Sequence, residues 1–332
     1  MKFKKILVTG GAGCIGIKVC NELMERGCEV VLYDMAEQIE VSQNSLSKEL
    51  QIFPGSIMDR TSLRDAISGC DGLIHLAAHL GVSRTEANKL RCLEINIDGT
   101  KNVLDAVSRS DSVSKFIFAS SSEVYGEPLK NPISEDDTTQ GKTLYAVSKL
   151  AGEELVKAYN YEFGNFDYTI LRYFNTYGPN QVAQFVIPKF IYRVQNGLEP
   201  VINGDGSQTR SYNFSSDTAR ATVDCLFAAE ANSLTMNIGN SREPISLKDL
   251  ASLIIKILGK EDEISPKIDK KFLSTDRVSE REINNRFCDS SLAEKIIGYE
   301  SLVTLEEGIR KVIDSKSISP DWMTKEKGYL VD

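Results

Sequence analysis

The sequence predicts an α/β protein with a doubly wound parallel sheet, followed by a smaller C-terminal α/β subdomain. Short β-branched segments, such as residues 5–9, 29–34 and 115–121, alternate with longer amphipathic segments of helical periodicity. Alternating strands and helices require right-handed crossovers, which cover both faces of a parallel sheet. After Pro179 the elements become shorter and more polar, and this change predicts the added subdomain.

The elements follow one another in a regular order in the first half of the chain. A buried strand is expected at residues 5–9, and a helix from Cys14 to Arg26 that ends at Gly27. Further strands are expected within 29–34, 50–55, 72–78, 115–121 and 167–173, and further helices within 60–69, 85–109 and 143–162. We expect one domain over residues 1–180 plus about 211–240, and a second unit over about 181–210 and 241–332.

Composition limits the classes of function. The 332 residues are 41% hydrophobic and 26% charged, which is ordinary for a soluble globular protein. The net charge of −8 argues against nucleic-acid binding, and no apolar run is long enough to span a membrane. The apolar run after the basic N-terminus is too short for a signal peptide. Seven scattered cysteines indicate reduced thiols in a cytoplasmic protein, and two histidines make a metal site unexpected.

A glycine-rich loop follows the first expected strand. Gly10, Gly13 and Gly16 in "TGGAGCIG" permit a tight turn and a close backbone approach to a pyrophosphate at a helix N-terminus. Asp34 ends the second expected strand, where a carboxylate can accept both hydroxyls of an adenosine ribose. No arginine follows at positions 35–37, so the pattern favours NAD over NADP and assigns the first domain as a Rossmann-type NAD-binding domain.

Tyr145 and Lys149 lie four residues apart on an expected helix and therefore share one face. A lysine near a phenol favours the phenolate, so the pair could act as a base tuned toward neutral pH. Alone, the pair could equally be two polar residues on a solvated face. With NAD bound, however, a tyrosinate could take the proton of an alcohol while its carbon gives up a hydride. The segment "ASSSEVYG" (119–126) follows a strand, which places serines at the carboxyl end of the sheet.

These segments together resemble the extended short-chain dehydrogenase/reductase family of NAD-dependent nucleotide-sugar epimerases and dehydratases. The resemblance runs from Lys5 to about Ile313. It rests on the glycine loop, Asp34, "IHLAA" (74–78), "NIDGTKNVLDA" (96–106), "SSSEVYG" (120–126), "YAVSK" (145–149), "RYFNTYGPNQ" (172–181) and "GDGSQTRSYNF" (204–214).

The resemblance implies roles for individual residues. Ser121, Tyr145 and Lys149 match the catalytic serine, the base and the lysine that tunes the base and holds the nicotinamide ribose, and Glu123 is a fourth catalytic candidate. The implied cofactor-binding residues are Gly10, Gly13, Cys14, Ile15, Gly16, Asp34, Ser56, Ile57, Leu76, Ala77, Ala78, Asn96, Ala119, Tyr145, Lys149 and Tyr173. The implied substrate-binding residues are His79, Arg84, Ser121, Ser122, Glu123, Asn175, Val186, Arg210, Arg281 and Arg286.

Several of these positions depart from the family or leave alternatives open. Ser56 stands where the family usually has an aspartate that reads adenine, and nearby Asp59 is interpreted as a helix cap. Arg281 or Arg286 supplies a second cationic contact to the diphosphate; the register before "CDSS" favours Arg286 and resembles the pattern of GDP-mannose epimerases. For the loop residues His79 and Arg84, substrate contact and simple solvation are equally expected.

The expected function is NAD-dependent oxidation at C4 of a GDP- or UDP-linked sugar to a 4-keto sugar, by a 4-epimerase or a 4-dehydrogenase. Ser122 stands where the 4,6-dehydratases have an acid, so dehydration is less expected. Ser-Glu at 122–123 also occurs in the UDP-glucuronate-type decarboxylases, so decarboxylation stays open. A sensor or scaffold that binds NAD without turnover would usually lose the tyrosine or the lysine. This chain keeps both, so a sensor or scaffold is not the expected function. We expect a homodimer or homotetramer through the helices within 85–109 and 143–162, with neither nucleic acid nor membrane as a partner.

Overall fold

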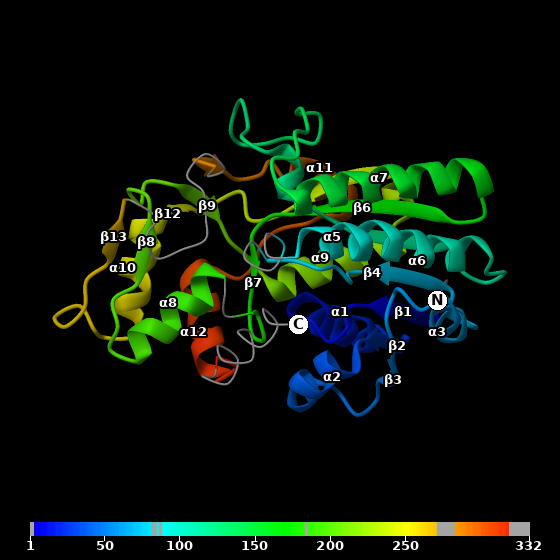
Figure 1. Cartoon of the computed structure of the whole chain (residues 1–332), viewed down its shortest axis with the longest axis horizontal. Coiled ribbons are helices and arrows are strands. Elements are labelled where there is room, and N and C mark those ends of the chain that lie inside the picture. Colours follow the sequence, from blue (N-terminus) through cyan, green and yellow to red (C-terminus); the bar gives the residue numbers. More distant parts are fainter. Residues whose placement is uncertain (1–2, 82–84, 86–87, 183–184, 271–282, 319–332) are drawn as a thin grey trace.

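The computed structural model describes residues 3–81, 85, 88–182, 185–270 and 283–318 (Figure 1). Its centre is a seven-stranded sheet with the strand order β11-β6-β5-β4-β1-β2-β3, in which every neighbouring pair is parallel. The strands are β1 Lys5–Thr9, β2 Glu29–Asp34, β3 Gln51–Pro54, β4 Gly72–His75, β5 Lys115–Ser121, β6 Asp167–Tyr173 and β11 Leu234–Ile238. The predicted doubly wound α/β class is confirmed, and six of these strands lie within the segments expected to form them.

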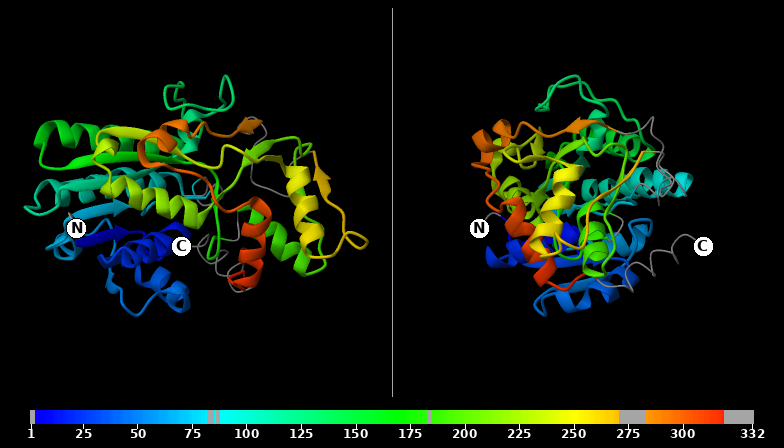
Figure 2. Two further views of the ribbon diagram at one scale, coloured as in Figure 1. Left: turned by 180° about the vertical axis from the view of Figure 1, so that it is seen from behind. Right: turned by 90° about the vertical axis from the view of Figure 1, so that its left-hand side faces the viewer.

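Helices cover both faces of this sheet, as the alternation of strands and helices requires (Figures 1 and 2). These helices are α1 Cys14–Glu25, α2 Ala36–Ser42, α3 Arg60–Ile67, α5 Lys89–Leu93, α6 Gly99–Ser108, α7 Leu144–Phe163, α9 Ser215–Phe227 and α11 Ser291–Ile297. Because side chains alternate along a strand, Ile6 and Val8 pack with α1 and α9, whereas Leu7 packs with α3 and α6 on the opposite face. The sheet is therefore buried between two hydrophobic layers.

The expected single helix over 85–109 is interrupted. The described part consists of α5, a π-helical turn at Glu94–Asp98, and α6. A π-helical turn inserts one extra residue and reorients the neighbouring side chains, and such turns occur frequently at functional sites. The interruption matters here because Asn96 lies inside it.

A second group of elements lies beyond the carboxyl end of β6, on the left in Figure 1. It contains α8 Val186–Gln195, β8 Val201–Asn203, β9 Thr209–Ser211, β12 Pro244–Ser246, α10 Leu247–Ile257, β13 Lys267–Asp269, β14 Asn285–Arg286 and α12 Leu305–Asp314. The strands β7 Thr176–Tyr177 and β10 Asn213–Phe214 pair between the two groups. A separate hydrophobic core, which includes Phe190, Ile254 and Ile309, holds the second group together.

This third core supports the proposed division into two domains, which stays a prediction. One segment suggests a refinement of its bounds. Helix α11 packs on the sheet, since Ala293 and Tyr299 belong to the same core as Ile6 and Val8. We therefore propose that residues 291–299 belong with the first domain, although they lie within the range 241–332 that was expected for the second.

Candidate active site

The glycine loop between β1 and α1 is closely packed against the end of β4. Gly10 has φ +73°, and a Cβ atom there would lie 2.6 Å from the backbone nitrogen of Ala77. A Cβ atom on Gly16 would lie 2.1 Å from the carbonyl oxygen of Gly10. Both positions therefore require glycine, and the loop brings free backbone N–H groups to the N-terminus of α1, where Cys14 and Ile15 form its first turn. The loop has the backbone geometry that a pyrophosphate needs.

The middle of this loop is fixed by three side chains. The backbone N–H of Ala12 donates to Asp34 Oδ2 at 3.0 Å, and its carbonyl oxygen accepts from Ser42 Oγ at 2.8 Å and Gln38 Nε2 at 3.2 Å. Burial raises the pKa of Asp34, while hydrogen bonds from the backbone N–H groups of Met35 and Ala12 counteract that rise. The carboxylate at the end of β2 thus holds the loop and still has lone pairs for ribose hydroxyls.

The segment expected to lie along the adenine also adopts a defined geometry. Ser56 Oγ accepts a hydrogen bond from the backbone N–H of Met58 at 3.2 Å, and Ile57 is buried. Asp59 caps α3 by accepting from the backbone N–H groups of Thr61 and Ser62, so its interpretation as a helix cap is confirmed.

Asn96 fixes the segment that follows β4. Its Oδ1 accepts from the backbone N–H of His79 at 2.7 Å, and its Nδ2 donates to the His79 carbonyl oxygen at 3.0 Å and to Ser148 Oγ at 2.9 Å. Leu76, Ala77 and Ala78 connect β4 to this clamp. Asn96 therefore fixes the segment that is expected to lie along the cofactor, through hydrogen bonds to its backbone, and connects it to α7.

His75 is buried beneath this segment and has a structural role. Thr100 Oγ1 donates to the Asn96 carbonyl oxygen at 2.6 Å, so it must accept from His75 Nε2 at 3.1 Å. That tautomer leaves Nδ1 to accept from Thr9 Oγ1 at 2.7 Å. Burial, and secondarily the charge of Lys149, lower the pKa of His75 to about 3. The ring is neutral at physiological pH and connects β1, β4 and α6.

This neutral histidine predicts a pH dependence of stability. An unfolded histidine binds a proton near pH 6.5, whereas folded His75 does so only near pH 3. Stability is therefore lost as the pH falls through this window, and His75 should contribute about 2 kcal/mol of the loss between pH 7 and pH 5. Urea unfolding of the wild type and His75→Gln at both values measures it. An equal pH dependence in the two proteins would contradict the prediction.

Tyr145 and Lys149 lie in the first turns of α7, and Ser121 ends β5 beside them. Ser121 lies close enough to Tyr145 that its hydroxyl lowers the pKa of the phenol. Lys149 is 4% exposed; its Nζ donates to the carbonyl oxygen of Ala119 at 2.8 Å and lies 5.8 Å from the centre of the Tyr145 ring. The structure thus brings together the three side chains that the sequence indicated as one site.

The predicted electrostatic tuning differs from what the protein's own groups produce. Burial, then the charge of Glu123 and then that of Cys92 raise the pKa of Tyr145, and the Ser121 hydroxyl lowers it. Burial lowers the pKa of Lys149 to about 8. In the protein alone, burial therefore dominates and opposes the phenolate. The expected tuning toward neutral pH, which included the positive nicotinamide, stays a prediction.

Glu123 faces this site from a 3₁₀ turn at Ser122–Tyr125. Its Oε2 accepts from Thr143 Oγ1 at 3.1 Å, and Thr143 also caps α7 by accepting from the backbone N–H of Ala146. Ser122 is buried in the same turn. The sequence reasoning missed Thr143; a threonine immediately before a helix is a recognisable cap, but its second contact depends on tertiary structure.

The residues expected to contact the substrate come from several elements. Asn175 has φ 31°, and its buried Oδ1 has no hydrogen-bond partner among the described residues. Val186 begins α8, and Arg210 and Arg286 are paired on β9 and β14. Arg210 donates to the carbonyl oxygens of residues 209, 283 and 284.

For three other expected positions the structure shows no contact with the candidate site: one lies in the hydrophobic core, and two lie outside the described residues. Tyr173, expected at the cofactor, lies in the core between the sheet and α9, and its hydroxyl is hydrogen-bonded to Thr222 Oγ1 at 2.7 Å. Arg84 and Arg281 lie outside the described residues.

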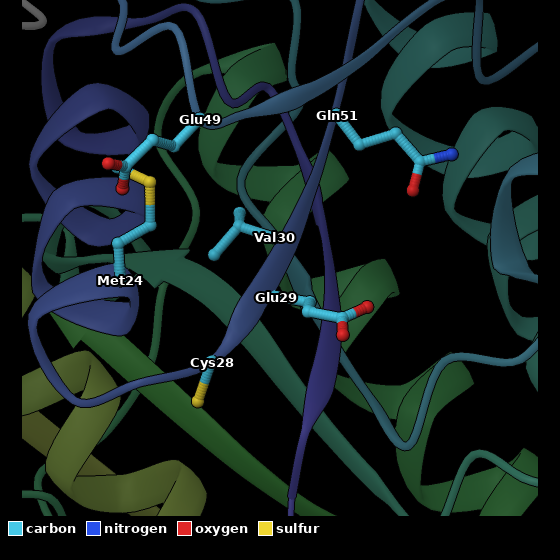
Figure 3. Close-up of a pocket in the computed structure, with 6 residues that line it drawn as sticks. All are labelled: Met24, Cys28, Glu29, Val30, Glu49 and Gln51. Atoms are coloured by element: carbon cyan, nitrogen blue, oxygen red, sulfur yellow. The ribbon is translucent and has the colours of Figure 1, made fainter.

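A separate cavity of about 380 Å³ lies at the other end of the sheet (Figure 3). Its lining includes Glu29 and Gln51 at the amino ends of β2 and β3, whereas the candidate site lies at the carboxyl ends. Figure 3 shows these two side chains pointing away from Glu49 and Met24, so the lining does not converge on a common point. Within the described ranges, no cluster of metal-ligating side chains occurs and no helix is long and apolar enough to span a membrane.

The class of protein follows from three features of the structure. They are a Rossmann-type sheet, a glycine loop held by Asp34, and a Ser-Tyr-Lys set at the carboxyl ends of the strands. Together they are typical of NAD-dependent oxidoreductases. Residues 6–239 match the model of the NAD dependent epimerase/dehydratase family. The chain belongs to this family, and it is therefore an NAD-dependent enzyme that acts on nucleotide sugars.

Relatives with several different reactions cover nearly the whole chain. A UDP-N-acetyl-alpha-D-glucosaminuronate decarboxylase from Bacillus cytotoxicus is 33% identical, over 93% of this chain and 97% of that protein. A putative UDP-glucose 4-epimerase from Methanocaldococcus jannaschii is 32% identical over the same shares. The structure of a UDP-glucuronic acid 4-epimerase from Bacillus cereus, in complex with UDP-glucuronic acid and NAD, has a TM-score of 0.83 and 30% identity, and covers 94% of this chain and 98% of that one.

Proposed function

We propose that this enzyme oxidises C4 of a UDP-linked sugar to a 4-ketone and returns the hydride to the opposite face, as a 4-epimerase. The observation that carries the proposal is that Ser121, Tyr145 and Lys149 lie close together at the carboxyl end of the sheet, the same end at which the glycine loop follows β1. Relatives that act on UDP-sugars favour UDP over GDP. Release of the ketone, which would make the enzyme a 4-dehydrogenase, requires the same residues and is the first alternative outcome.

Each of the three residues has a distinct task in this proposal. Tyr145 accepts the proton of the C4 hydroxyl as the C4–H bond breaks, and Ser121 donates a hydrogen bond to the developing alkoxide. Lys149 stabilises the phenolate and holds the nicotinamide ribose. Bound NAD supplies the hydride acceptor and a positive ring, and that charge favours the phenolate in a site where burial alone opposes it.

The substrate's nucleotide diphosphate fits the second group of elements. We propose that Arg210 and Arg286, side by side on β9 and β14, neutralise the diphosphate. Asn175, whose Oδ1 has no hydrogen-bond partner in the part of the chain that the structure describes, follows the carboxyl end of β6 and offers a polar amide there. Val186 and His79 are proposed to contact the nucleotide and the sugar, respectively.

Decarboxylation is the second candidate function, and the position of the Glu123 carboxylate beside Tyr145 favours it. This carboxylate is held by Thr143 and lies close enough to Tyr145 to raise the pKa of the phenol.

A 4,6-dehydratase needs a proton donor for the leaving 6-hydroxyl, and the buried hydroxyl of Ser122 is a poor acid. We therefore expect no loss of water from C6.

Incubation with a panel of UDP- and GDP-sugars, including uronates, tests the proposal. Mass spectrometry, the absorbance of NADH and the proton NMR couplings at C4 of the sugar distinguish the outcomes. Unchanged mass with an inverted C4 configuration is the expected result. Loss of two hydrogens with NADH formation would indicate a 4-dehydrogenase, and loss of carbon dioxide would indicate the decarboxylase. Loss of water would indicate a dehydratase and would overturn the expectation drawn from Ser122.

A homodimer built on α5, α6 and α7 is also proposed. These helices lie side by side in Figures 1 and 2. Exposed apolar side chains occur on α5 and α7, with Leu90 75%, Val147 45% and Tyr161 91% exposed. The double variant Leu90→Glu/Val147→Glu should sediment as a monomer, whereas Leu302→Glu, at an exposed leucine outside these helices, should not change assembly. A wild-type protein that sediments only as a monomer at micromolar concentration would contradict the prediction.

A further inference from the structure

Glu153 lies one helical turn after Lys149 on α7 and is 1% exposed. Its Oε1 accepts from Ser120 Oγ at 2.5 Å and from Arg172 Nε at 3.0 Å, and its Oε2 accepts from Arg172 Nη2 at 2.8 Å. This one carboxylate therefore joins α7 to both β5 and β6. Ser120 directly precedes Ser121, so the joint lies immediately behind the candidate site.

Arg172 extends this network to the turn that carries Glu123. Its Nη1 donates to the Tyr125 hydroxyl at 2.9 Å, and its guanidinium carbon lies 4.8 Å from the centre of the Tyr125 ring. Tyr125 in turn donates to Asn237 Oδ1 on β11 at 2.7 Å. Three strands, one helix and the turn after Ser121 are thus held in a single arrangement by directional bonds.

Stability alone does not account for such a network. Removing two charges from water costs several kcal/mol per ion, and the mutual attraction of a buried pair often only offsets that cost. What the network does supply is geometry, because a bidentate ion pair fixes distance and orientation together. The groups whose geometry it fixes are the end of β5 and the first turns of α7.

We propose that Glu153 is a positioning residue that sets the spacing between Ser121 on β5 and Tyr145 and Lys149 on α7. The inference rests on the proposed function of those three residues. Glu153 does not contact the reacting atoms; it acts through Ser120 and through its charge near Lys149.

The charge of Glu153 gives the proposal a measurable signature. The groups that face Lys149 are Glu153 and Tyr145 on α7, Cys92 on α5 and His75 on β4. Burial lowers the pKa of Lys149, and Cys92 and then Glu153 raise it. Removing the carboxylate should therefore let Lys149 lose its proton at a lower pH, and the alkaline limb of the kcat profile should move in the same direction.

The test compares Glu153→Gln with Glu154→Gln, the adjacent exposed glutamate of the same helix. We expect kcat of Glu153→Gln to fall about 10- to 100-fold at its optimum, with KM within about threefold, because small misplacements of catalytic groups cost rates of this order. Its alkaline limb should move to lower pH. Glu154→Gln should match the wild type in all three respects.

Two milder variants keep the test valid if Glu153→Gln does not fold. Ser120→Ala removes one bond to the carboxylate but keeps the ion pair, so kcat should fall about 10-fold with an unmoved alkaline limb. Ser120→Thr keeps the hydroxyl and should restore the rate.

Two results would overturn the proposal. The first is a folded Glu153→Gln with wild-type kcat and an unmoved limb. The second is a wild-type rate in Ser120→Ala combined with a rate loss in Glu153→Gln that moves no limb, because this would indicate general destabilisation. An active Tyr145→Phe would instead refute the proposed function, so the two failures can be distinguished.

Discussion

Replacement of Tyr145 by phenylalanine is expected to remove nearly all turnover while the protein folds and keeps NAD. The ring stays in place, but the only matched proton acceptor for the C4 hydroxyl is lost. General acid–base groups typically contribute about 10²- to 10⁴-fold in rate, so kcat should fall at least about 100-fold. Steady-state kinetics with the substrate found in the nucleotide-sugar panel, together with the absorbance spectrum of bound NAD, measure both effects.

Tyr161→Phe is the matched control, since Tyr161 lies on the same helix and is 91% exposed. It should retain the wild-type kcat. A Tyr145→Phe variant that does the same would remove Tyr145 from the mechanism and leave Glu123 as the group to examine.

Gly16→Ala is expected to abolish tight binding of NAD. The added methyl group would lie 2.1 Å from the carbonyl oxygen of Gly10, which is backbone and cannot rotate away. Overpacking of this kind costs about 1–3 kcal/mol of unfolding free energy. Because the displaced backbone is the expected pyrophosphate cradle, we also expect NAD affinity to fall at least about 100-fold, a loss of about 2.7 kcal/mol. Calorimetric titration with NAD and urea unfolding measure the two losses.

Gly13→Ala in the same loop is the graded control for stability. Gly13 has φ −81°, and its added methyl would lie 3.3 Å from the Gly10 carbonyl oxygen, a contact that a small shift relieves. Its unfolding free energy should stay close to that of the wild type. Wild-type NAD affinity in Gly16→Ala would show that the loop is only a strand-to-helix turn.

The sequence predicts the sheet well because its signals are local. β1 and β5 are apolar runs of the right length, and Gly10 and Asp34 stand where a strand ends, so their places follow from strand geometry. The same reasoning predicted one continuous helix over 85–109. It could not predict the π-helical turn at Asn96, because the bonds of Asn96 to His79 and Ser148 are tertiary contacts.

The electrostatics of the site were the least predictable part. The spacing of Tyr145 and Lys149 indicates a shared face, and the structure confirms that they are neighbours. The direction of the pKa shift of Tyr145 depends on how deeply the phenol is buried and on Glu123, which the chain brings in from 22 residues away. The network of Glu153 likewise assembles residues from five separate elements, and no short pattern encodes it.

The central proposal is that C4 of the UDP-sugar would be oxidised and then reduced on its opposite face, with bound NAD supplying the hydride acceptor and donor. A UDP-sugar that carries deuterium at C4, mixed with a stoichiometric amount of the NAD-loaded enzyme, tests this claim most directly. We predict a transient absorbance at 340 nm that forms more slowly than with the protium substrate, and a C4-inverted product that retains its deuterium. Inversion without transient absorbance and without an isotope effect, or loss of the deuterium to water, would contradict the account.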